Sequence, residues 1–412
     1  MKDREKLAFE VGKVFTPATP VSEGALFAGR MEQIRRVVDV INQRGQHAVI
    51  FGERGVGKTS LANIVSSKLT SPGTQILAPR INCDSTDDYS TLWKKFFSQV
   101  DLIQKTPVPG FQYTVFQETL KPSEVAGDSV TPDDVRRLLT LMSVGALVIV
   151  IFDEFDRLMN RKVRRALADT IKALSDYDVG ATLVVVGVAD TVDELISEHQ
   201  SVERALVQVR MPRMSQSELH EILDKGLARL GMGITEDAKR QISLLSQGLP
   251  HYTHLLGLHS TRLAIDAGSR QVSTNHVRAA IVKSVEDAQQ SLRSGYREAI
   301  TSPRRDNIYG HVLLASALAR TDEFGYFAAA DVRLPLSEIM GKPYDIPGFA
   351  RHLNDFSHPD RGAVLRKTGV KHKFRFRFRN PLMQPLVIMK GMVDKRIDAE
   401  ALQRIRGEAQ VQ

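Results

Sequence analysis

The stretch at residues 52–59, GERGVGKT, has the residue types and the spacing that binding of a nucleotide polyphosphate needs. It fits the pattern G-x-x-x-x-G-K-[ST] at every position, after a short apolar run and before a helical one. Glycines let consecutive backbone N–H groups wrap a phosphate, and the helix N-terminus adds partial positive charge. Lys58 is expected to reach the β- and γ-phosphates, and Thr59 to offer its hydroxyl to Mg²⁺. The residues predicted to bind ATP here are Gly52, Glu53, Arg54, Gly55, Val56, Gly57, Lys58, Thr59 and Ser60.

Two adjacent acids, Asp153 and Glu154, end the apolar run at residues 146–152. An acid at the carboxyl edge of a sheet is placed to hold Mg²⁺, and the next glutamate can polarise the water that attacks the γ-phosphate. We therefore predict Thr59 and Asp153 as Mg²⁺ ligands, and Glu154 with Lys58 as catalytic residues of ATP hydrolysis. The alternative is a strand-end acid that caps the following helix.

A sheet covered by helices is expected to position these residues. Apolar strands that alternate with helices predict a parallel sheet with both faces covered. The predicted strands are HAVIF, TQILAPRINCD, ALVIVIFDE, ATLVVVGVAD and ALVQVRM. Residues 104–133 mix Pro, Gly, Thr and Ser, which predicts an insertion or a long loop.

The remainder of the chain changes character twice. From residue 215 to about 290 only helical patterns occur, which predicts an all-helical domain. Helical patterns at GHVLLASALAR, PLSEIMG and IPGFARHLNDFS then precede two alternating segments, AVLRKTG and KFRFRFR. Three helices followed by a hairpin are the order of a winged helix. The predicted fold class is α/β: a P-loop parallel-sheet core, a helical lid and a C-terminal winged-helix domain.

Composition limits the classes of protein that fit. The longest apolar stretch, residues 146–152, is far short of the roughly 18 residues of a membrane span. The N-terminus has no apolar core of the signal-peptide kind. A single cysteine, Cys83, excludes an internal disulfide framework. We expect a cytoplasmic protein without a membrane partner.

Positive charge is concentrated in the last quarter of the chain. Residues 301–412 contain 19 Lys and Arg against 12 Asp and Glu, whereas residues 1–300 contain 37 and 36. Residues 361–379 contain eight cations and no acid. A one-sided field of this kind favours polyanions. The alternative is a solvated basic surface that only aids solubility.

The run KHKFRFRFRN, residues 371–380, alternates phenylalanines with cations. Side chains of a strand point alternately to opposite faces, so Phe374, Phe376 and Phe378 are predicted to be buried on one face. Surface charges add little to stability, so the other face is predicted to contact duplex DNA, mostly without base specificity. An acidic partner or the protein's own nucleotide domain is the alternative. The predicted nucleic-acid contacts are Arg351, Arg366, Lys367, Lys371, Lys373, Arg375, Arg377 and Arg379.

The P-loop, the acid pair, a strand ending near residue 190 and a helical lid together resemble the AAA+ family. The resemblance implies that Arg30, in LFAGR (26–30), belongs to a segment against the adenine. It implies that Asp190, in GVAD (187–190), lies at the sensor-1 position, where the family usually has Asn, Thr or Ser. Arg204, in SVER (201–204), resembles the arginine finger that reaches a neighbouring subunit, which predicts a homo-oligomer. An ordinary salt-bridging arginine is the alternative.

The motif GLPHYTHLL, residues 248–256, lies where the resemblance places the lid's sensor-2 motif. The family usually has an arginine there, whereas this chain has His251, which is not a fixed cation at pH 7. GLP also resembles the lid motif of the STAND signalling ATPases, in which the proline lies near the base. Pro250 and His251 are therefore added to the predicted nucleotide site.

The three predicted domains together resemble origin-recognition initiators, transposition-regulating ATPases and STAND regulators over residues 23–392. Two hypotheses follow: an ATPase that assembles on DNA and recruits an unidentified effector protein, or a signalling switch whose winged helix controls the nucleotide state. The predicted boundaries are an N-terminal arm at 1–22, an AAA+ domain at 23–213, a lid at 214–297, a winged helix at 298–392 and a tail at 393–412.

Overall fold

The computed structural model divides the chain into two compact units. It describes residues 2–21, 23–68, 75–107, 115–120, 122–125, 127, 129–189, 192, 202–303, 307–322, 324–370 and 373–411. The helical unit comprises Met1–Thr19, Arg54–Val56 and Pro212–Gln412, and the sheet unit comprises Pro20–Glu53 and Gly57–Met211. The predicted lid and winged helix fall in one unit, and the boundary between them stays a prediction.

The sheet unit is built on a six-stranded parallel sheet, as the apolar runs predicted. The strand order is β2-β6-β7-β1-β8, and β3 also pairs with β6. The strands are β1 (His47–Gly52), β2 (Gln75–Leu77), β3 (Arg80–Asn82), β6 (Ala146–Asp153), β7 (Ala181–Val188) and β8 (Leu206–Arg210). The central strands β1, β6 and β7 are almost entirely buried, which explains why they read as continuous apolar runs.

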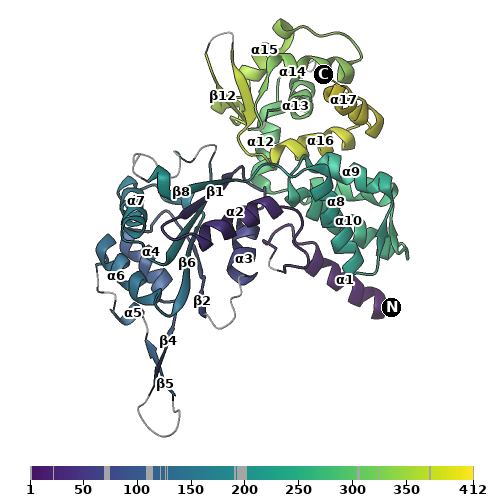
Figure 1. The fold of residues 1–412 in the computed structure, drawn as a ribbon. Helices are drawn as coiled ribbons and strands as arrows, with labels where there is room; N and C mark the ends of the chain where they lie inside the picture. The colour runs from purple at the N-terminus through teal and green to yellow at the C-terminus, as the bar shows by residue number, and fades with distance from the viewer. Residues whose placement is uncertain are drawn as a thin grey trace. The chain divides into compact units, whose positions relative to one another are not determined.

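Helices cover both faces of this sheet (Figure 1). They are α2 (Met31–Asn42), α3 (Lys58–Lys68), α4 (Tyr89–Phe97), α6 (Pro132–Met142) and α7 (Arg161–Asp176). The main apolar cluster joins α4, α6 and α7 to β6 and β7, with Trp93 fully buried and packed edge-on against Phe152 at 5.4 Å between ring centroids. A packed core of this kind fixes the carboxyl ends of the strands, where the predicted site residues lie.

Two strands lie within the segment predicted to be an insertion or a long loop. β4 (Leu102–Pro107) and β5 (Val115–Leu120) pair antiparallel, and a short helix, α5 (Pro122–Val125), follows them. The sequence of β5, VFQETL, has the β-branched and aromatic residues that strands favour, but the Pro and Gly residues near it favour a loop. The inserted segment is therefore a hairpin rather than an irregular loop.

The helical unit begins with a helix where the sequence predicted a polar arm. In α1 (Lys2–Val14) and directly after it, Val11, Val14 and Phe15 are buried. The ring of Phe15 lies against Gly257, where an added Cβ would come within 2.9 Å of it. The arm is therefore anchored by an aromatic side chain that fits over a glycine of a distant helix.

Four helices form the predicted lid, namely α8 (Gln216–Arg229), α9 (Glu236–Ser246), α10 (Pro250–Asp266) and α11 (Thr274–Glu286). Ser215 and Glu218 form a capping box that starts α8. The short strands β9 (Gly233–Ile234) and β10 (Gln271–Val272) pair beside these helices.

The C-terminal region contains the helices and the hairpin that the sequence predicted. Its elements are α12 (Gln290–Ile300), α13 (Tyr309–Leu318), β11 (Phe327–Ala328), α14 (Ala329–Met340), α15 (Ile346–Asp355), β12 (Leu365–Thr368), β13 (Arg375–Phe378), α16 (Met383–Val393) and α17 (Ala399–Val411). The predicted short helix at PLSEIMG is the end of the longer α14, and β11 adds a third strand in the order β11-β13-β12. In the described parts of the chain, no helix has the length and apolarity that crossing a membrane requires.

Candidate nucleotide site and basic hairpin

The predicted phosphate-binding loop joins β1 to α3, which is the context that its pattern requires. Gly52, Gly55 and Gly57 have φ angles of 149°, 87° and 96°, which side chains with a Cβ rarely adopt. An added Cβ at Gly52 would lie 2.4 Å from the carbonyl oxygen of Met211. The glycines are therefore required both by backbone conformation and, at Gly52, by close packing.

Lys58 is positioned by the loop itself. Its side chain is buried, and Nζ donates hydrogen bonds to the carbonyl oxygens of Gly52 at 3.0 Å and Glu53 at 2.7 Å. Lys58 begins α3, and Thr59 follows it in the first turn of the helix. The ammonium group is thus held at the start of the helix, where the N-terminal partial charge also favours an anion.

The segment before α2 is attached to the helix that carries the loop. The backbone N–H of Val21 donates a hydrogen bond to Ser60 Oγ at 3.1 Å. Arg30 precedes α2 in a left-handed conformation with φ of 63°, and it is 3% exposed. Ser60 therefore ties residues before α2 to α3, whereas the predicted contact of Arg30's segment with adenine stays a prediction.

Asp153 is fixed by two hydrogen bonds at the end of β6. It is 2% exposed; Oδ1 accepts the N–H of Glu154 at 2.8 Å, and Oδ2 accepts Nη1 of Arg80 at 3.0 Å. Arg80 comes from β3, whose Asn82 is in register with Asp153. Sequence reasoning missed Arg80, although its position near the carboxyl end of a neighbouring strand is a signal that it lies beside the acid pair.

Glu154 is exposed and has a strained backbone. Its φ is 55°, in the left-handed region that residues other than glycine rarely occupy, and such strain is concentrated at functional sites. Its Oε2 pairs with Nη1 of Arg157 at 2.8 Å. Arg157 ends the 3₁₀ helix η1 (Phe155–Arg157), which starts directly after Glu154. The carboxylate predicted to polarise water is therefore held by an arginine three residues further on.

Thr59 and Asp153 offer a hydroxyl and a carboxylate, which are the oxygen ligands that Mg²⁺ prefers. Mg²⁺ usually binds through one or two protein ligands together with water and substrate phosphates. The part of the chain that the structure describes contains no group of three or more His, Cys, Asp or Glu side chains that would hold a metal ion. The donor set therefore fits a Mg²⁺ ion that enters with the nucleotide.

Two further residues, Asp190 and Arg204, were expected to complete the nucleotide site. Asp190 lies outside the described residues, but the strand before it is tied to η1, because Val188 N–H donates to Asp156 Oδ1 at 2.8 Å. Arg204, in the 3₁₀ helix η3 (Glu203–Ala205), has a side chain 78% exposed and pairs with Asp176 at 3.0 Å. Its exposure is consistent with an arginine finger, and its ion pair is consistent with an ordinary salt-bridging arginine. The role of Arg204 therefore stays a prediction.

Pro250 and His251 form the first turn of α10 in the helical unit. His251 Nδ1 donates a hydrogen bond to the carbonyl oxygen of Pro17 at 2.8 Å. Burial lowers the pKa of His251, and the positive charge of Arg54 lowers it further. Both effects favour the neutral form of His251, and its contact with nucleotide stays a prediction.

The basic hairpin, defined as β12, β13, the residues between them and Arg379, has the two-faced character that the sequence predicted. Phe376 and Phe378 are each 3% exposed and pack near Phe327 of β11, with ring centroids 6.1 and 6.5 Å apart. Phe374 is only partly buried, and Lys367 Nζ lies 3.6 Å from the centroid of its ring. Burial is thus confirmed for Phe376 and Phe378, and it is partial for Phe374.

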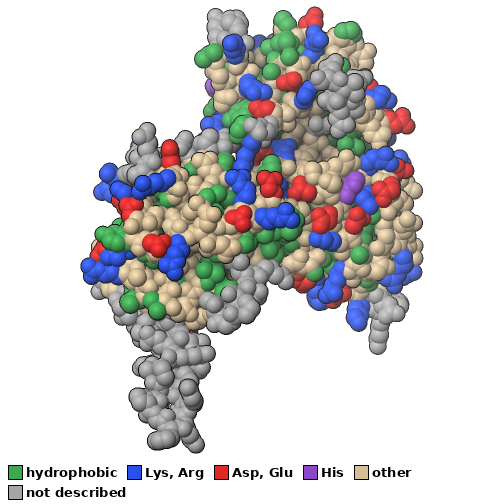
Figure 2. Space-filling view, viewed as in Figure 1, with side chains coloured by type: hydrophobic (Ala, Val, Ile, Leu, Met, Phe, Trp, Pro, Cys, Tyr) green, Lys and Arg blue, Asp and Glu red, His purple; other side chains and the backbone are tan. Residues whose placement is uncertain are grey.

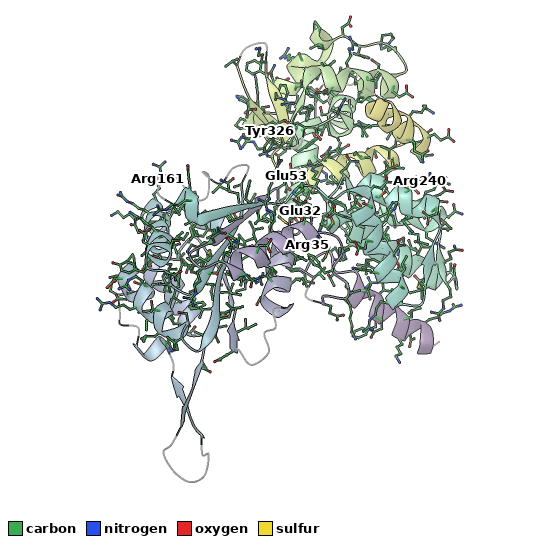
Figure 3. All side chains as sticks on the ribbon, in the orientation of Figure 1. Glu32, Arg35, Glu53, Arg161, Arg240 and Tyr326 are labelled. Atoms are coloured by element: carbon green, nitrogen blue, oxygen red, sulfur yellow. The ribbon has the colours of Figure 1, made fainter. Side chains whose placement is uncertain are left out.

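Several cations of the hairpin are engaged within the protein. Arg375 pairs with Asp322 at 2.9 Å, and Arg377 lies over the ring of Tyr326 at 4.7 Å (Tyr326 is labelled in Figure 3). Lys367 Nζ donates to Asn354 Oδ1 at 2.6 Å. Lys373 and Arg379 are exposed, and Lys371 lies outside the described residues. Nothing near the hairpin in the sequence pointed to Asp322 or Tyr326 as partners.

On the outer face of the hairpin, two arginines lie directly opposite each other. Arg366 of β12 is in register with Arg377 of β13, and Thr368 is in register with Arg375. Like charges that face each other across two strands destabilise the pair. Arg377 also lies over Tyr326 and donates to the carbonyl oxygen of Phe324, so interactions within the protein offset part of this repulsion.

The helix before the hairpin, α15, offers few groups for reading bases in a groove of DNA. Arg351 is 87% exposed, with its Nε 3.8 Å from Asp355. Asn354 is bonded to Lys367, and His352 packs on Tyr309 with ring centroids 4.6 Å apart. Arg351 is therefore the most accessible of these three side chains.

Comparison with known proteins adds three kinds of similarity. Residues 26–186 match the family model of the AAA ATPase domain. The chain is 23% identical over 255 residues to the ORC1-type DNA replication protein 2 of Thermoplasma acidophilum, covering 60% of this chain and 58% of that protein. It is 20% identical over 254 residues to the ORC1-type DNA replication protein of Thermoplasma volcanium, again covering 60% and 58%. The match thus spans less than two thirds of either relative.

Among solved structures, the ORC2 protein of Aeropyrum pernix covers 97% of this chain and 98% of its own, with a TM-score of 0.50 and 16% identity. A Walker-type ATPase of Pyrococcus abyssi covers 91% and 99%, with a TM-score of 0.51 and 16% identity. At this level of identity the similarity concerns the fold alone.

Proposed function

We propose that this chain, whose residues 26–186 form an AAA ATPase domain, binds and hydrolyses ATP and contacts duplex DNA through the basic hairpin in a nucleotide-dependent way. The observation that carries the proposal is a complete phosphate loop between β1 and α3, with an acid pair at the end of β6, in a chain that also has a cation-rich hairpin. The names of the curated relatives, ORC1-type DNA replication proteins, support the choice of DNA as the partner.

In the proposed reaction, the loop's backbone N–H groups and Lys58 bind the β- and γ-phosphates. Thr59 and Asp153 would hold Mg²⁺, which neutralises phosphate charge when it is bound. Glu154 accepts a proton from, or orients, the water that attacks the γ-phosphate, and its ion pair with Arg157 must open for that. Asp153 needs no rearrangement, because its two hydrogen bonds already fix it.

The proposed DNA contact is made mainly to the phosphate backbone. A polyanion against the outer face would neutralise the charges of Arg366 and Arg377, which are opposite each other in register. Lys373, Arg379 and Arg351 are exposed and are further candidates for phosphate contact. Because α15 offers few base-reading groups, we expect weak sequence preference.

A second candidate function is a signalling switch whose hairpin region contacts a protein rather than DNA. The observation that favours it is that Arg375, Arg377 and Lys367 already have partners within the protein. The neutral His251 at the sensor-2 position also suits slow turnover. This function predicts that ADP copurifies with the protein and that duplex DNA binds poorly.

Further parts of the proposal concern partners and location. The exposed Arg204 supports a homo-oligomer in which it reaches a neighbouring subunit's nucleotide, and an effector protein would then be recruited to the assembly. A single, buried cysteine suits a reducing compartment, so we propose a cytoplasmic location.

Duplex-DNA binding measured by fluorescence anisotropy, with ATP, with ADP and without nucleotide, tests the proposal. The variant Lys373→Glu/Arg379→Glu reverses two exposed charges, and Arg270→Glu/Arg278→Glu makes the same change of net charge on the lid. We expect tight, ATP-dependent binding that the hairpin variant weakens at least tenfold and the lid variant leaves intact. Equal affinity in the wild type and the hairpin variant would contradict the proposal.

A further inference from the structure

We propose that the first turns of α7 carry a second contact for the DNA backbone, on the ATPase domain itself. The α7 patch is defined as Arg161, Lys162 and Arg165. This inference rests on the proposed DNA binding, and it adds a contact surface that lies in the sheet unit, whereas the basic hairpin lies in the helical unit.

The three side chains of the α7 patch are exposed, and Arg165 follows Lys162 by three residues and Arg161 by four, so it neighbours both on the helix surface. Within the described parts of the chain, none of the three has an ion pair. Figure 3 labels Arg161 at the start of α7, and Figure 2 shows Lys and Arg side chains gathered over this helix. Two further cations lie close in sequence, but Arg164 donates to the carbonyl oxygen of Leu158 and Arg157 pairs with Glu154.

Stability of the helix does not explain these cations. The first turn of a helix favours acids, because its free N–H groups carry partial positive charge. The first turn of α6 has Asp133 and Asp134, and that of α9 has Glu236 and Asp237, whereas that of α7 has no acid. The α7 patch therefore repels both itself and the helix terminus, and binding of an anion would remove both penalties.

The chemistry of the patch favours the backbone of duplex DNA over other polyanions. Binding of single strands without sequence preference combines cations with aromatic side chains on which bases stack. Phe155, the aromatic residue nearest in sequence, is fully buried, and Tyr177 lies at the opposite end of α7. Cations without an exposed aromatic platform suit phosphates that are presented by a stacked duplex.

The patch is close in sequence to the hydrolysis site. Residues 155–160 connect Glu154 to α7, and Asn160 Oδ1 accepts the N–H of Lys162 at 2.9 Å. The same connection carries the ion pair of Arg157 with Glu154. DNA on the α7 patch is therefore placed to attract Arg157 away from Glu154, and stimulation of ATP hydrolysis by DNA is expected to depend on this patch.

The test compares Arg161→Ala/Lys162→Ala/Arg165→Ala with Arg270→Ala/Arg278→Ala/Lys283→Ala, which removes the same charge from the lid. Binding of duplex DNA is measured with ATP across a salt series. Each lost phosphate contact lowers the log–log salt slope by about 0.9, so we expect the α7 variant to lose about 2 to 3 from the slope. The lid variant should keep the wild-type slope, and the α7 variant should melt no lower than the wild type.

The outcomes separate this inference from the proposed function. An α7 variant with the wild-type slope, alongside a hairpin variant with a reduced slope, overturns the inference and leaves the proposed function standing. Equal losses in the α7 and lid variants also overturn it, because net charge would then explain the effect. A wild-type protein that binds no duplex DNA overturns both. ATP hydrolysis that DNA stimulates equally in the wild type and the α7 variant contradicts the link to Glu154.

Discussion

The phosphate loop and the basic hairpin are both predicted to bind phosphates, but they are built in different ways. The loop is built mainly from backbone, with glycines at positive φ and a lysine held by carbonyl oxygens of the loop. The hairpin is built from side chains, several of which are engaged by residues 50 positions or more away in the chain, such as Asp322. A binding site built from backbone groups can be recognised from the spacing of residues in a short segment. The function of a charged side chain depends also on which distant residues contact it.

The comparison predicts the largest effect for Lys58→Ala. Removal of the ammonium that the loop holds should lower ATP affinity at least a hundredfold, because a charge-assisted contact to the phosphates is lost in a largely buried position. Titration with a fluorescent ATP analogue measures this. Lys68→Ala, at the other end of α3, is the matched control and should bind as the wild type does. Near-normal affinity of Lys58→Ala would mean that the loop does not hold the nucleotide.

On the hairpin, the two faces of β13 are expected to differ in stability. Phe376→Ala should lower the free energy of unfolding by about 3–5 kcal/mol, since its ring is buried against Phe327. Arg375→Ala should lower it by about 1 kcal/mol or less, because its ion pair with Asp322 is partly exposed. Denaturant unfolding of the full chain compares the two. Similar losses in both variants would show that the charged face is structural as well.

The strand that leads into the phosphate loop should make stability depend on pH. His47 of β1 accepts the N–H of Leu183 on Nδ1 at 3.0 Å, and burial lowers its pKa to about 4. The unfolded chain, with an ordinary histidine pKa near 6.5, binds the proton first as pH falls. The contribution of His47 is therefore present above pH 6.5 and decreases by about 3 kcal/mol between pH 6.5 and 4. The variant His47→Gln should show a flatter profile, and an unchanged profile would refute the assignment.

The smallest effect is expected for Arg157→Ala. Its exposed ion pair restrains Glu154 only weakly, so releasing the glutamate should raise the rate of ATP hydrolysis by up to about fivefold. ATP affinity should stay the same. Steady-state turnover measures the change, with Glu154→Gln as the reference that removes hydrolysis. A slower Arg157→Ala enzyme would show that the pair supports catalysis instead of restraining it.

The sequence predicted those parts of the fold that depend on residue patterns within short segments. Apolar strands alternating with helices gave the parallel sheet, and the match of residues 26–186 to the AAA ATPase domain confirms the resemblance drawn from the P-loop and the acid pair. The burial of α1 was missed, because the groove for Phe15 is made by Gly226 and Gly257, far away in the sequence. The β4–β5 hairpin was missed, because its strand signal is short and lies among Pro and Gly.

The candidate site shows the same limit. The loop and the acid pair follow from spacing, but Arg80 reaches Asp153 only because β3 and β6 are neighbours in register. Similarly, the buried face of the hairpin could be predicted from alternation alone, whereas its internal ion pair with Asp322 could not. Contacts between distant segments depend on register and packing, which a single sequence does not contain.

Nucleotide and duplex DNA are expected to affect each other's binding, and measuring ATP affinity with and without DNA tests this. Binding free energies are linked, so DNA must tighten ATP binding by the same factor by which ATP tightens DNA binding. Titration of the fluorescent ATP analogue into Glu154→Gln, which prevents hydrolysis, is made with saturating duplex and without it. We expect tighter ATP binding with duplex present. The factor should equal the one by which ATP increases DNA affinity in the anisotropy measurements. ATP affinity that duplex DNA leaves unchanged would contradict this expectation.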